Sequence, residues 1–137
     1  MGDTGNKKTI RVVAAIVRRQ DKYLITQRRP NATLPLLWEF PGGKVETGED
    51  DETALKREFR ERLDAEIRVG KLARSVRHQY DAYTIELHAY DCELVSEGLK
   101  PVRVNDYRWV LVGELDQYQF PGADQATVEK LVAEFNN

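Results

Sequence analysis

The sequence lacks the features on which several classes of protein depend. It contains one cysteine, Cys92, among 137 residues, which excludes an internal disulfide. No apolar run approaches the length that spans a bilayer, and the first residues show no secretory signal pattern. The formal net charge is -2, so no global positive field attracts nucleic acid. We expect a cytoplasmic protein that binds neither a nucleic-acid polymer nor a membrane.

What is present suits one compact domain. A chain of 137 residues with 41% hydrophobic residues can bury a single core. Residues 1–8 are short and polar, so we interpret them as a flexible tail that precedes a single domain over residues 9–137. The sequence does not distinguish a monomer from a homodimer.

The first half of the chain predicts strands that lead into a helix. A β-branched run over residues 9–18 indicates a largely buried strand, and residues 23–26 would form the returning strand. Prolines make residues 30–37 a loop, and the short apolar piece 38–40 is stopped by Pro41-Gly42-Gly43. A helix is expected over residues 50–63, with Asp50 as its N-cap and an apolar stripe formed by Leu55, Phe59 and Leu63.

The second half predicts more strands and a closing helix. Residues 65–76, 83–94 and 107–112 have strand patterns, and a terminal helix is expected over residues 124–135. Strands divided by one central helix and closed by another indicate a mixed α/β domain.

The segment from Gly42 to Glu61 carries the most specific chemistry. A Gly-Gly turn brings backbone with little steric bulk close to a helix. On that helix, Glu58 and Glu61 are spaced i, i+3, so their carboxylates share one face. Such a pair suits a hard cation such as Mg²⁺, which takes oxygen ligands and shares its coordination shell with phosphate. Taken alone, two such glutamates are more often a solvated helix face.

This segment resembles the Nudix box, in which a glycine, five residues, a glutamate, seven residues and an Arg-Glu pair follow at fixed spacing. The matching positions are Gly43, Glu49, Arg57, Glu58, Phe59 and Glu61. Other segments are similar to the MutT and CTP pyrophosphohydrolase branch of that family: residues 12–16, 27–29, 38–41, Trp109 and 120–124. The resemblance implies the Nudix fold, an α/β/α sandwich around a mixed, curved sheet.

The resemblance also implies a site for a metal ion and phosphates. Glu58 and Glu61, helped by the backbone carbonyl of Gly42, would bind Mg²⁺, for which Mn²⁺ is a possible substitute. Arg57 and Glu49 would form a supporting pair beside these ligands.

Five residues are candidates for binding the substrate, and the resemblance implies a role for Lys44, Arg28 and Asp124. Lys44 and Arg28 would face phosphate oxygens, and Tyr80 and Tyr83 either line a nucleobase pocket or pack against the core. Asp124 stands where the MutT branch reads the edge of the base. It is also a plausible N-cap for the last helix.

Four positions depart from the family pattern. Arg62 replaces the second glutamate of the box, Asp64 its glycine and Ala65 its final aliphatic residue, and Arg103 stands where this branch often has a further glutamate. A cation about 4 Å from a second positive charge costs roughly 4 kcal/mol at an effective dielectric of about 20, and more beside a divalent ion. Arg62 must therefore turn away from a metal, contact the triphosphate or pair with Glu58. Glu46, Glu49 and Asp64 are the acids that could compensate.

Two functions of different class follow. The first is an Mg²⁺-dependent nucleoside triphosphate pyrophosphohydrolase of house-cleaning type that acts on 8-oxo-dGTP or on (d)CTP. The second, suggested by Arg62 and Arg103, is a weakened or inactive Nudix-fold module that binds nucleotides. A hydrolase of another nucleoside diphosphate derivative, such as a nucleotide sugar, is a third possibility.

Overall fold

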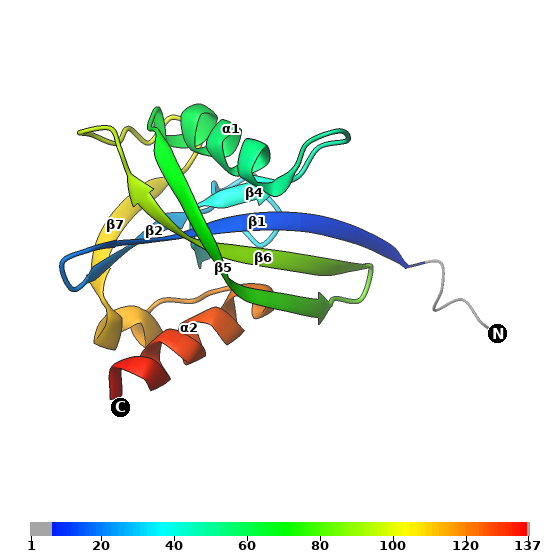
Figure 1. The fold of residues 1–137 in the computed structure, drawn as a ribbon. Coiled ribbons are helices and arrows are strands. Elements are labelled where there is room, and N and C mark those ends of the chain that lie inside the picture. The colour runs from blue at the N-terminus through cyan, green and yellow to red at the C-terminus, as the bar shows by residue number, and fades with distance from the viewer. Residues whose placement is uncertain (1–6, 137) are drawn as a thin grey trace.

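The computed structural model describes residues 7–136 and consists of one mixed sheet between two helices (Figure 1). The helix α1 covers one face of the sheet, and α2 covers the other. The elements in chain order are β1 (Lys8–Arg19), β2 (Lys22–Gln27), β3 (Trp38–Glu39), β4 (Gly42–Lys44), α1 (Asp51–Leu63), β5 (Ile67–Gln79), β6 (Tyr83–Leu94), β7 (Asp106–Leu111), the 3₁₀ helix η2 (Val112–Gln117) and α2 (Gly122–Asn136).

The strand β1 is the centre of the sheet. It pairs in parallel with β6 over ten registered positions and antiparallel with β2 and β4, in the order β3-β2-β1-β6-β5. Outside this order, β7 pairs antiparallel with β2 over six registered positions. The sheet is therefore mixed, as the sequence predicts.

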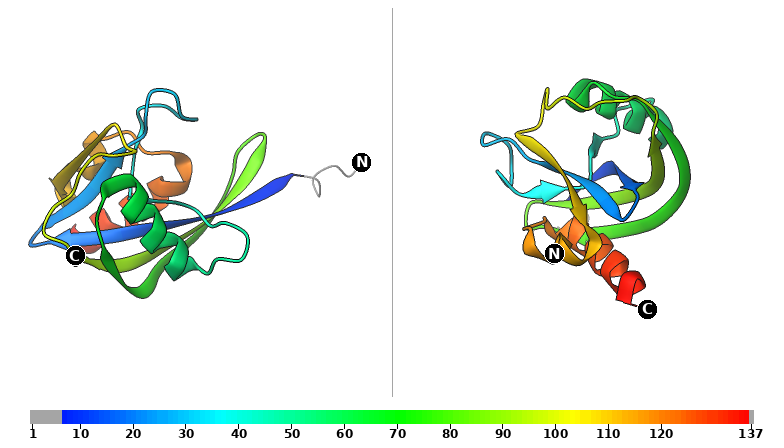
Figure 2. Two further views of the ribbon diagram at one scale, coloured as in Figure 1. Left: turned by 90° about the horizontal axis from the view of Figure 1, so that it is seen from above. Right: turned by 90° about the vertical axis from the view of Figure 1, so that its left-hand side faces the viewer.

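The outer strand β5 gives the sheet its curvature, which the end-on view in Figure 2 shows as a long arc. Its antiparallel register with β6 shifts twice, between Val69 and Leu72 and between Leu72 and Arg74. Such bulges bend a strand and increase its twist. The bend makes one side of the sheet concave.

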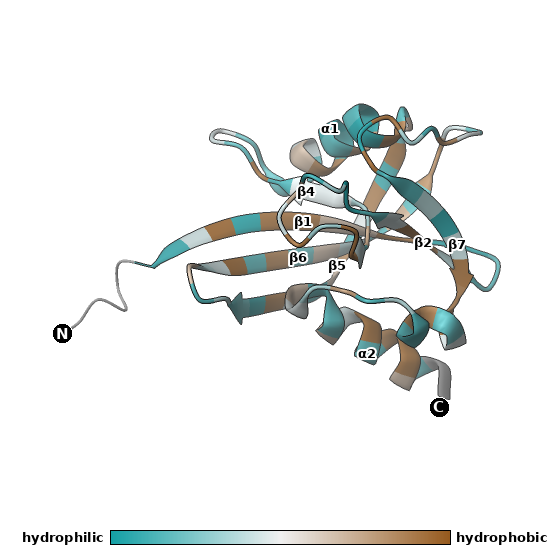
Figure 3. Ribbon diagram, turned by 180° about the vertical axis from the view of Figure 1, so that it is seen from behind, coloured by the Kyte–Doolittle hydropathy of each residue, from teal (hydrophilic) through white to brown (hydrophobic). Residues whose placement is uncertain are grey.

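The apolar residues form two cores, one on each face of the sheet. Ala14 and Ile16 of β1 pack in the cluster that includes α2, and Val13, Ala15 and Val17 pack in the cluster that includes α1. Alternate residues of a strand point to opposite faces. This explains the continuous apolar run of residues 12–17 and confirms the expected buried strand. Figure 3 shows the hydrophobic residues of β1 and β6 as brown stretches of these strands.

The Gly42-Gly43 pair was expected to be a turn, and this expectation was wrong. These residues belong to β4, where Gly42 pairs with Ala14 and Gly43 pairs with Val13. A Cβ atom added to Gly42 would lie 1.9 Å from the carbonyl oxygen of Val13. The glycine is therefore required because two backbones approach closely, and not because the chain reverses there.

Both ends of α1 are capped by acidic residues. The carboxylate of Asp50 accepts a hydrogen bond from the backbone N–H of Thr53 at 2.8 Å, which confirms the expected N-cap. Asp64 ends the helix in the left-handed conformation with φ of 50°, and its N–H donates to Arg60. Aspartate tolerates this conformation better than most residues with a side chain, so it can stand at the glycine position of the box.

Two boundaries differ from the sequence prediction. α2 begins at Gly122, so Asp124 lies inside its first turn and the N-cap interpretation of Asp124 was wrong. β1 already begins at Lys8, and residues 1–6 of the expected tail lie outside the described residues. Within residues 7–136, the helices are too short or too polar to cross a bilayer.

Candidate active site

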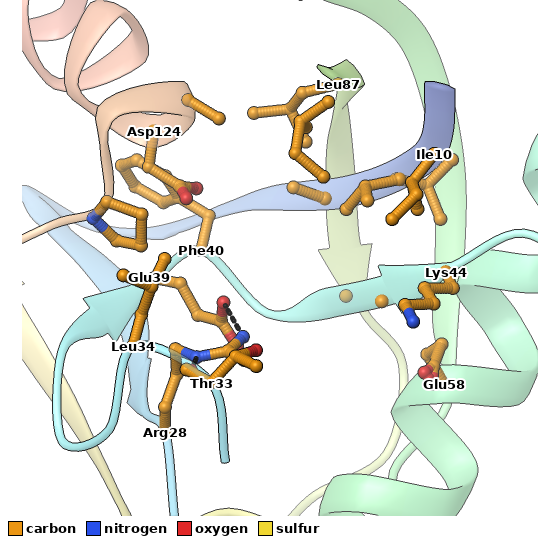
Figure 4. A pocket seen from close by; sticks show the side chains of 18 of the residues that line it. Ile10, Arg28, Thr33, Leu34, Glu39, Phe40, Lys44, Glu58, Leu87 and Asp124 are labelled. Carbon is orange, nitrogen blue, oxygen red and sulfur yellow. Dashed lines mark hydrogen bonds and ion pairs between the residues drawn. The ribbon is translucent and has the colours of Figure 1, made fainter. Parts of the chain in front are cut away.

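A cleft of about 520 Å³ opens on the concave side of the sheet. One end, here called the glycine end, is lined by Gly42, Gly43, Lys44, Arg57, Glu58, Glu61 and Arg62. The other, here called the aromatic end, is lined by Phe40, Tyr80, Tyr83, Ile85, Leu87, Pro121, Ala123 and Asp124. Figure 4 shows Glu58 and Lys44 at one side of the cleft and Asp124 at the other, with Arg28 and Glu39 below. The cleft therefore has one charged and one largely apolar end.

At the glycine end, the carboxylate of Glu58 rests directly against β4. Its side chain is 7% exposed, and a Cβ atom added to Gly43 would lie 2.0 Å from its Oε2. Any side chain at position 43 would push Glu58 out of its place, since a buried carboxylate has little room to move. This contact explains on steric grounds why the box position 43 is a glycine in this chain.

Arg57 joins the loop before α1 to the helix. Its Nε donates to Oε2 of Glu49 at 2.7 Å and its Nη2 to Oε1 of the same residue at 2.9 Å, a bidentate pair. Nη2 also donates to the carbonyl of Lys44 at 3.0 Å. The pKa of Glu49 lies below its usual value, because of this bond and a backbone bond with Glu46. The supporting pair expected from the sequence is thus present as a contact.

The two predicted metal ligands are both paired with arginines. The Nε of Arg62 donates to both oxygens of Glu58, at 3.1 and 3.3 Å. Oε1 of Glu61 accepts from Nη1 of Arg57 at 3.2 Å and lies 4.0 Å from Nη1 of Arg103. Of the three alternatives for Arg62, the pairing with Glu58 is the one that occurs in the structure.

The glycine end, as it stands, does not fit a resident metal ion. Its carboxylates are the hard oxygen ligands that Mg²⁺ prefers, but their charge is already compensated by guanidinium groups. Among residues 7–136, no three His, Cys, Asp or Glu side chains are arranged to hold a metal.

The three acids expected to compensate for Arg62 are paired with other residues or lie away from Glu58 and Glu61. Glu49 pairs with Arg57, Asp64 caps α1 3.7 Å from Lys100, and Glu46 lies 3.7 Å from Arg57. The metal role of Gly42, Glu58 and Glu61 stays a prediction.

Arg28 lines the cleft on the side of Glu39 and Asp124 and is held in place by three hydrogen bonds (Figure 4). It donates to Oε1 of Glu39 at 3.1 Å, to the carbonyl of Thr33 at 2.6 Å and to the Thr33 hydroxyl at 2.9 Å. In the structure the guanidinium of Arg28 lines the cleft and pairs with the half-buried Glu39, and its expected contact with phosphate stays a prediction. Lys44, the other expected phosphate contact, is exposed at the cleft edge.

Asp124 is the buried carboxyl of the aromatic end. Its pKa is raised well above the usual value, mainly because burial disfavours the charged form and also because Glu39 lies close by. Burial likewise raises the pKa of Glu39, while Arg28 opposes the shift. Burial therefore favours the protonated form of Asp124, in which the O–H can donate while the carbonyl oxygen accepts.

Tyr80 and Tyr83 form one wall of the aromatic end. Their ring centroids are 5.1 Å apart, and the Tyr80 hydroxyl accepts a hydrogen bond from the backbone N–H of Ala123 at 3.1 Å. This bond ties the wall to the start of α2, next to Asp124. The structure brings both tyrosines to the cleft, and stacking on a base stays a prediction.

Sequence reasoning missed the role of Glu39. The residue was noticed only as part of Trp38-Glu39-Phe40-Pro41, where its neighbours are core residues, 8% and 2% exposed. The signal that could have found it was an acid between two buried aromatics, because a charge in such a place needs a partner.

The comparisons with known proteins agree with this architecture. A family model described as NUDIX domain matches residues 12–130. The chain is 36% identical over 126 residues to the CTP pyrophosphohydrolase of Escherichia coli K12, covering 92% of this chain and 93% of that one. It is 33% identical over 136 residues to the 8-oxo-dGTP diphosphatase of Haemophilus influenzae, covering 96% and 98%.

Solved structures give the same result. A solution structure of MutT from methicillin-resistant Staphylococcus aureus is 38% identical, with a TM-score of 0.75 and coverage of 93% and 98%. A crystal structure of a MutT protein from Methanosarcina mazei is similar in fold, with 22% identity, a TM-score of 0.82 and coverage of 96% and 98%. The fold, the spacing of the box and these relatives place the chain in the Nudix hydrolase family, in the MutT and CTP pyrophosphohydrolase-like branch of nucleotide pyrophosphohydrolases.

Proposed function

We propose that this protein converts a nucleoside triphosphate and water to a nucleoside monophosphate and pyrophosphate, with 8-oxo-dGTP or (d)CTP as the substrate. The observation that carries the proposal is a single cleft with a charged glycine end and an aromatic end that contains a buried carboxyl. The anhydride bond between the α and β phosphates breaks as water adds across it. The relatives named above act on triphosphates of these bases by their names.

The aromatic end supplies the recognition of the base in this proposal. In its protonated form, which burial favours, Asp124 offers a hydroxyl donor and a carbonyl acceptor side by side, and this pair complements a base edge with an adjacent acceptor and donor. The exocyclic amino group of cytosine is a donor of this kind. The oxo and N–H groups on the edge of an oxidised guanine also meet the requirement, so both substrates stay in the proposal.

The glycine end supplies charge for the phosphates. Lys44 and the arginines of this end are the cations that line it, and guanidinium groups match phosphate oxygens in bidentate geometry. Because Glu58 and Glu61 are paired with arginines, we place the divalent cation in the proposal as part of the Mg²⁺–triphosphate substrate. Mn²⁺ is the natural substitute to test.

Pyrophosphate release over a panel of nucleotides, with Mg²⁺ and then with Mn²⁺, tests this function. We expect release from 8-oxo-dGTP or (d)CTP and a loss of turnover in Glu58→Gln. Glu52→Gln is the matched control, because Glu52 lies on the same helix but is exposed and pairs with Lys56. Unchanged turnover in Glu58→Gln would place the chemistry elsewhere.

A second candidate function is a nucleotide-binding module without turnover. The arginine partners of Glu58 and Glu61 favour it, since they occupy the carboxylates expected to bind a metal. Calorimetric titration with the same nucleotides separates the two candidates. Measurable binding together with no release of pyrophosphate from any triphosphate would favour the module.

A further inference from the structure

A second, smaller cavity lies beside the glycine end of the cleft. Its volume is about 230 Å³, and it shares Arg28, Glu58, Glu61 and Arg62 with the cleft. The complete lining is Arg28, Arg29, Ala32, Glu58, Glu61, Arg62, Arg103 and Val104. Arg28 is paired with Glu39, and the other three guanidinium groups face two carboxylates, so the cavity has an excess of positive charge at neutral pH. An anion is the ligand that such a lining favours.

The backbone fixes two of these arginines next to each other. The carbonyl of Arg62, in the last turn of α1, accepts hydrogen bonds from the N–H groups of Val102 at 3.0 Å and Arg103 at 3.1 Å. The N–H of Lys100 donates to Leu63 at 2.8 Å. The segment between β6 and β7 is therefore attached to the end of α1, which brings Arg103 beside Glu61.

The other side of the cavity is attached in the same way. The N–H of Asn105 donates to the carbonyl of Gln27 at 2.9 Å, and their side chains are joined at 2.6 Å. Gln27 ends β2, so this contact sets the position of Arg28 and Arg29, which follow it directly. The four arginines come from three separate segments that the fold holds together.

Arg62 and Arg103 keep donors that their ion pairs do not use. Both bonds from Arg62 to Glu58 use Nε, so Nη1 and Nη2 lie outside those bonds. Arg103 is 64% exposed, and its contact with Glu61 is long, at 4.0 Å. A guanidinium group can hold a carboxylate on one edge and a phosphate on the other, because its five N–H donors point along a planar fork.

We propose that this cavity is a diphosphate site, which binds pyrophosphate and the terminal phosphates of the triphosphate through guanidinium groups and without a resident metal ion. The triphosphate part rests on the function proposed above, whereas the binding of pyrophosphate stands by itself. In this site Arg62 stands where the box pattern has an acid and Arg103 where this branch often has one, and the two arginines replace the neutralising charge of a bound cation.

The test is calorimetric titration of the full-length protein with inorganic pyrophosphate in the presence of EDTA. We expect binding by the unchanged protein, with the affinity reduced about tenfold or more in Arg62→Gln and in Arg103→Gln, as the loss of a charged hydrogen bond implies. The matched control is Arg60→Gln, which removes an arginine from the same helix that is exposed and lies 3.6 Å from Glu66, outside the cavity.

Arg62→Gln also leaves Glu58 with one guanidinium partner fewer, so its folding is checked by circular dichroism. Arg103→Gln changes an exposed side chain, so the proposal can still be tested with this variant if Arg62→Gln unfolds. Pyrophosphate binding that requires Mg²⁺, or an affinity unchanged in Arg103→Gln, would overturn the proposal.

The two proposals fail in different ways. Metal-free binding of pyrophosphate with the expected loss in the variants, but no hydrolysis of any triphosphate, would leave the diphosphate site and remove the catalytic function. Hydrolysis of a triphosphate with no metal-free binding of pyrophosphate would do the reverse.

Discussion

The aromatic and glycine ends of the cleft each contain carboxyl groups near arginines. They differ in whether burial or an arginine partner dominates the environment of the carboxyl group. At the aromatic end, burial raises the pKa of Asp124, and the nearby Arg28 is already engaged with Glu39. At the glycine end, Glu58 is just as buried, but Arg62 bonds both of its oxygens and Arg57 lies 3.5 Å away. Burial therefore favours the protonated carboxyl at one end, whereas an ion pair occupies the other. The comparison teaches that two buried carboxyl groups in one cleft can differ in their hydrogen-bonding role according to their neighbours.

The largest expected effect comes from disturbing the glycine end through its backbone. Gly43→Ala places a methyl group where the Glu58 carboxylate lies, so we expect turnover to fall about a hundredfold, as a misplacement of about 1 Å can cause. Steady-state release of pyrophosphate measures this effect. Gly98→Ala is the matched control, because a Cβ atom there meets nothing within 4 Å. Equal turnover in the two variants would show that the position of Glu58 is unimportant for the reaction.

A smaller effect sharpens the comparison at the aromatic end. The folded-state pKa of Asp124 is raised, so its protonated form stabilises the fold at low pH, and this contribution is lost as the pH rises through the folded pKa. Asp124→Asn keeps the shape but cannot ionise. We therefore expect the variant to lose less stability than the unchanged protein as the pH is raised, measured by thermal unfolding across a pH series. Parallel pH profiles for the two proteins would mean that Asp124 is already ionised in the fold.

The smallest expected effect concerns the wall of the aromatic end. Tyr80→Phe leaves the N–H of Ala123 without its hydroxyl partner, which costs about 1 kcal/mol of unfolding free energy. We expect a decrease in Tm of a few degrees, roughly 4 °C for a domain of this size, with little change in turnover. Tyr83→Phe is the control, because it removes a hydroxyl from the same wall without removing the hydrogen bond between Ala123 and Tyr80. A large loss of turnover in Tyr80→Phe would give the hydroxyl a role in binding the substrate.

Much of the fold could be predicted from local patterns. The apolar run of residues 12–17 predicted a buried strand, and the Asp50 cap with the stripe of Leu55, Phe59 and Leu63 predicted α1, because these signals depend on residues close together in the chain. The Gly42-Gly43 pair could not be assigned in this way. Its conformation is set by pairing with β1, thirty residues earlier, and a sequence pattern shows the absence of a side chain but not the neighbour that requires it.

The sequence by itself determined the family, the spacing of the box and the residues that share a helical face, since those follow from order along the chain. The tertiary structure alone decided which charges pair and which are buried. Arg103 reaches Glu61 because backbone bonds attach its loop to the end of α1, and the pKa of Asp124 is raised because the fold buries it near Glu39. Ion pairing and desolvation depend on distances through space, and these distances do not exist until the chain has folded.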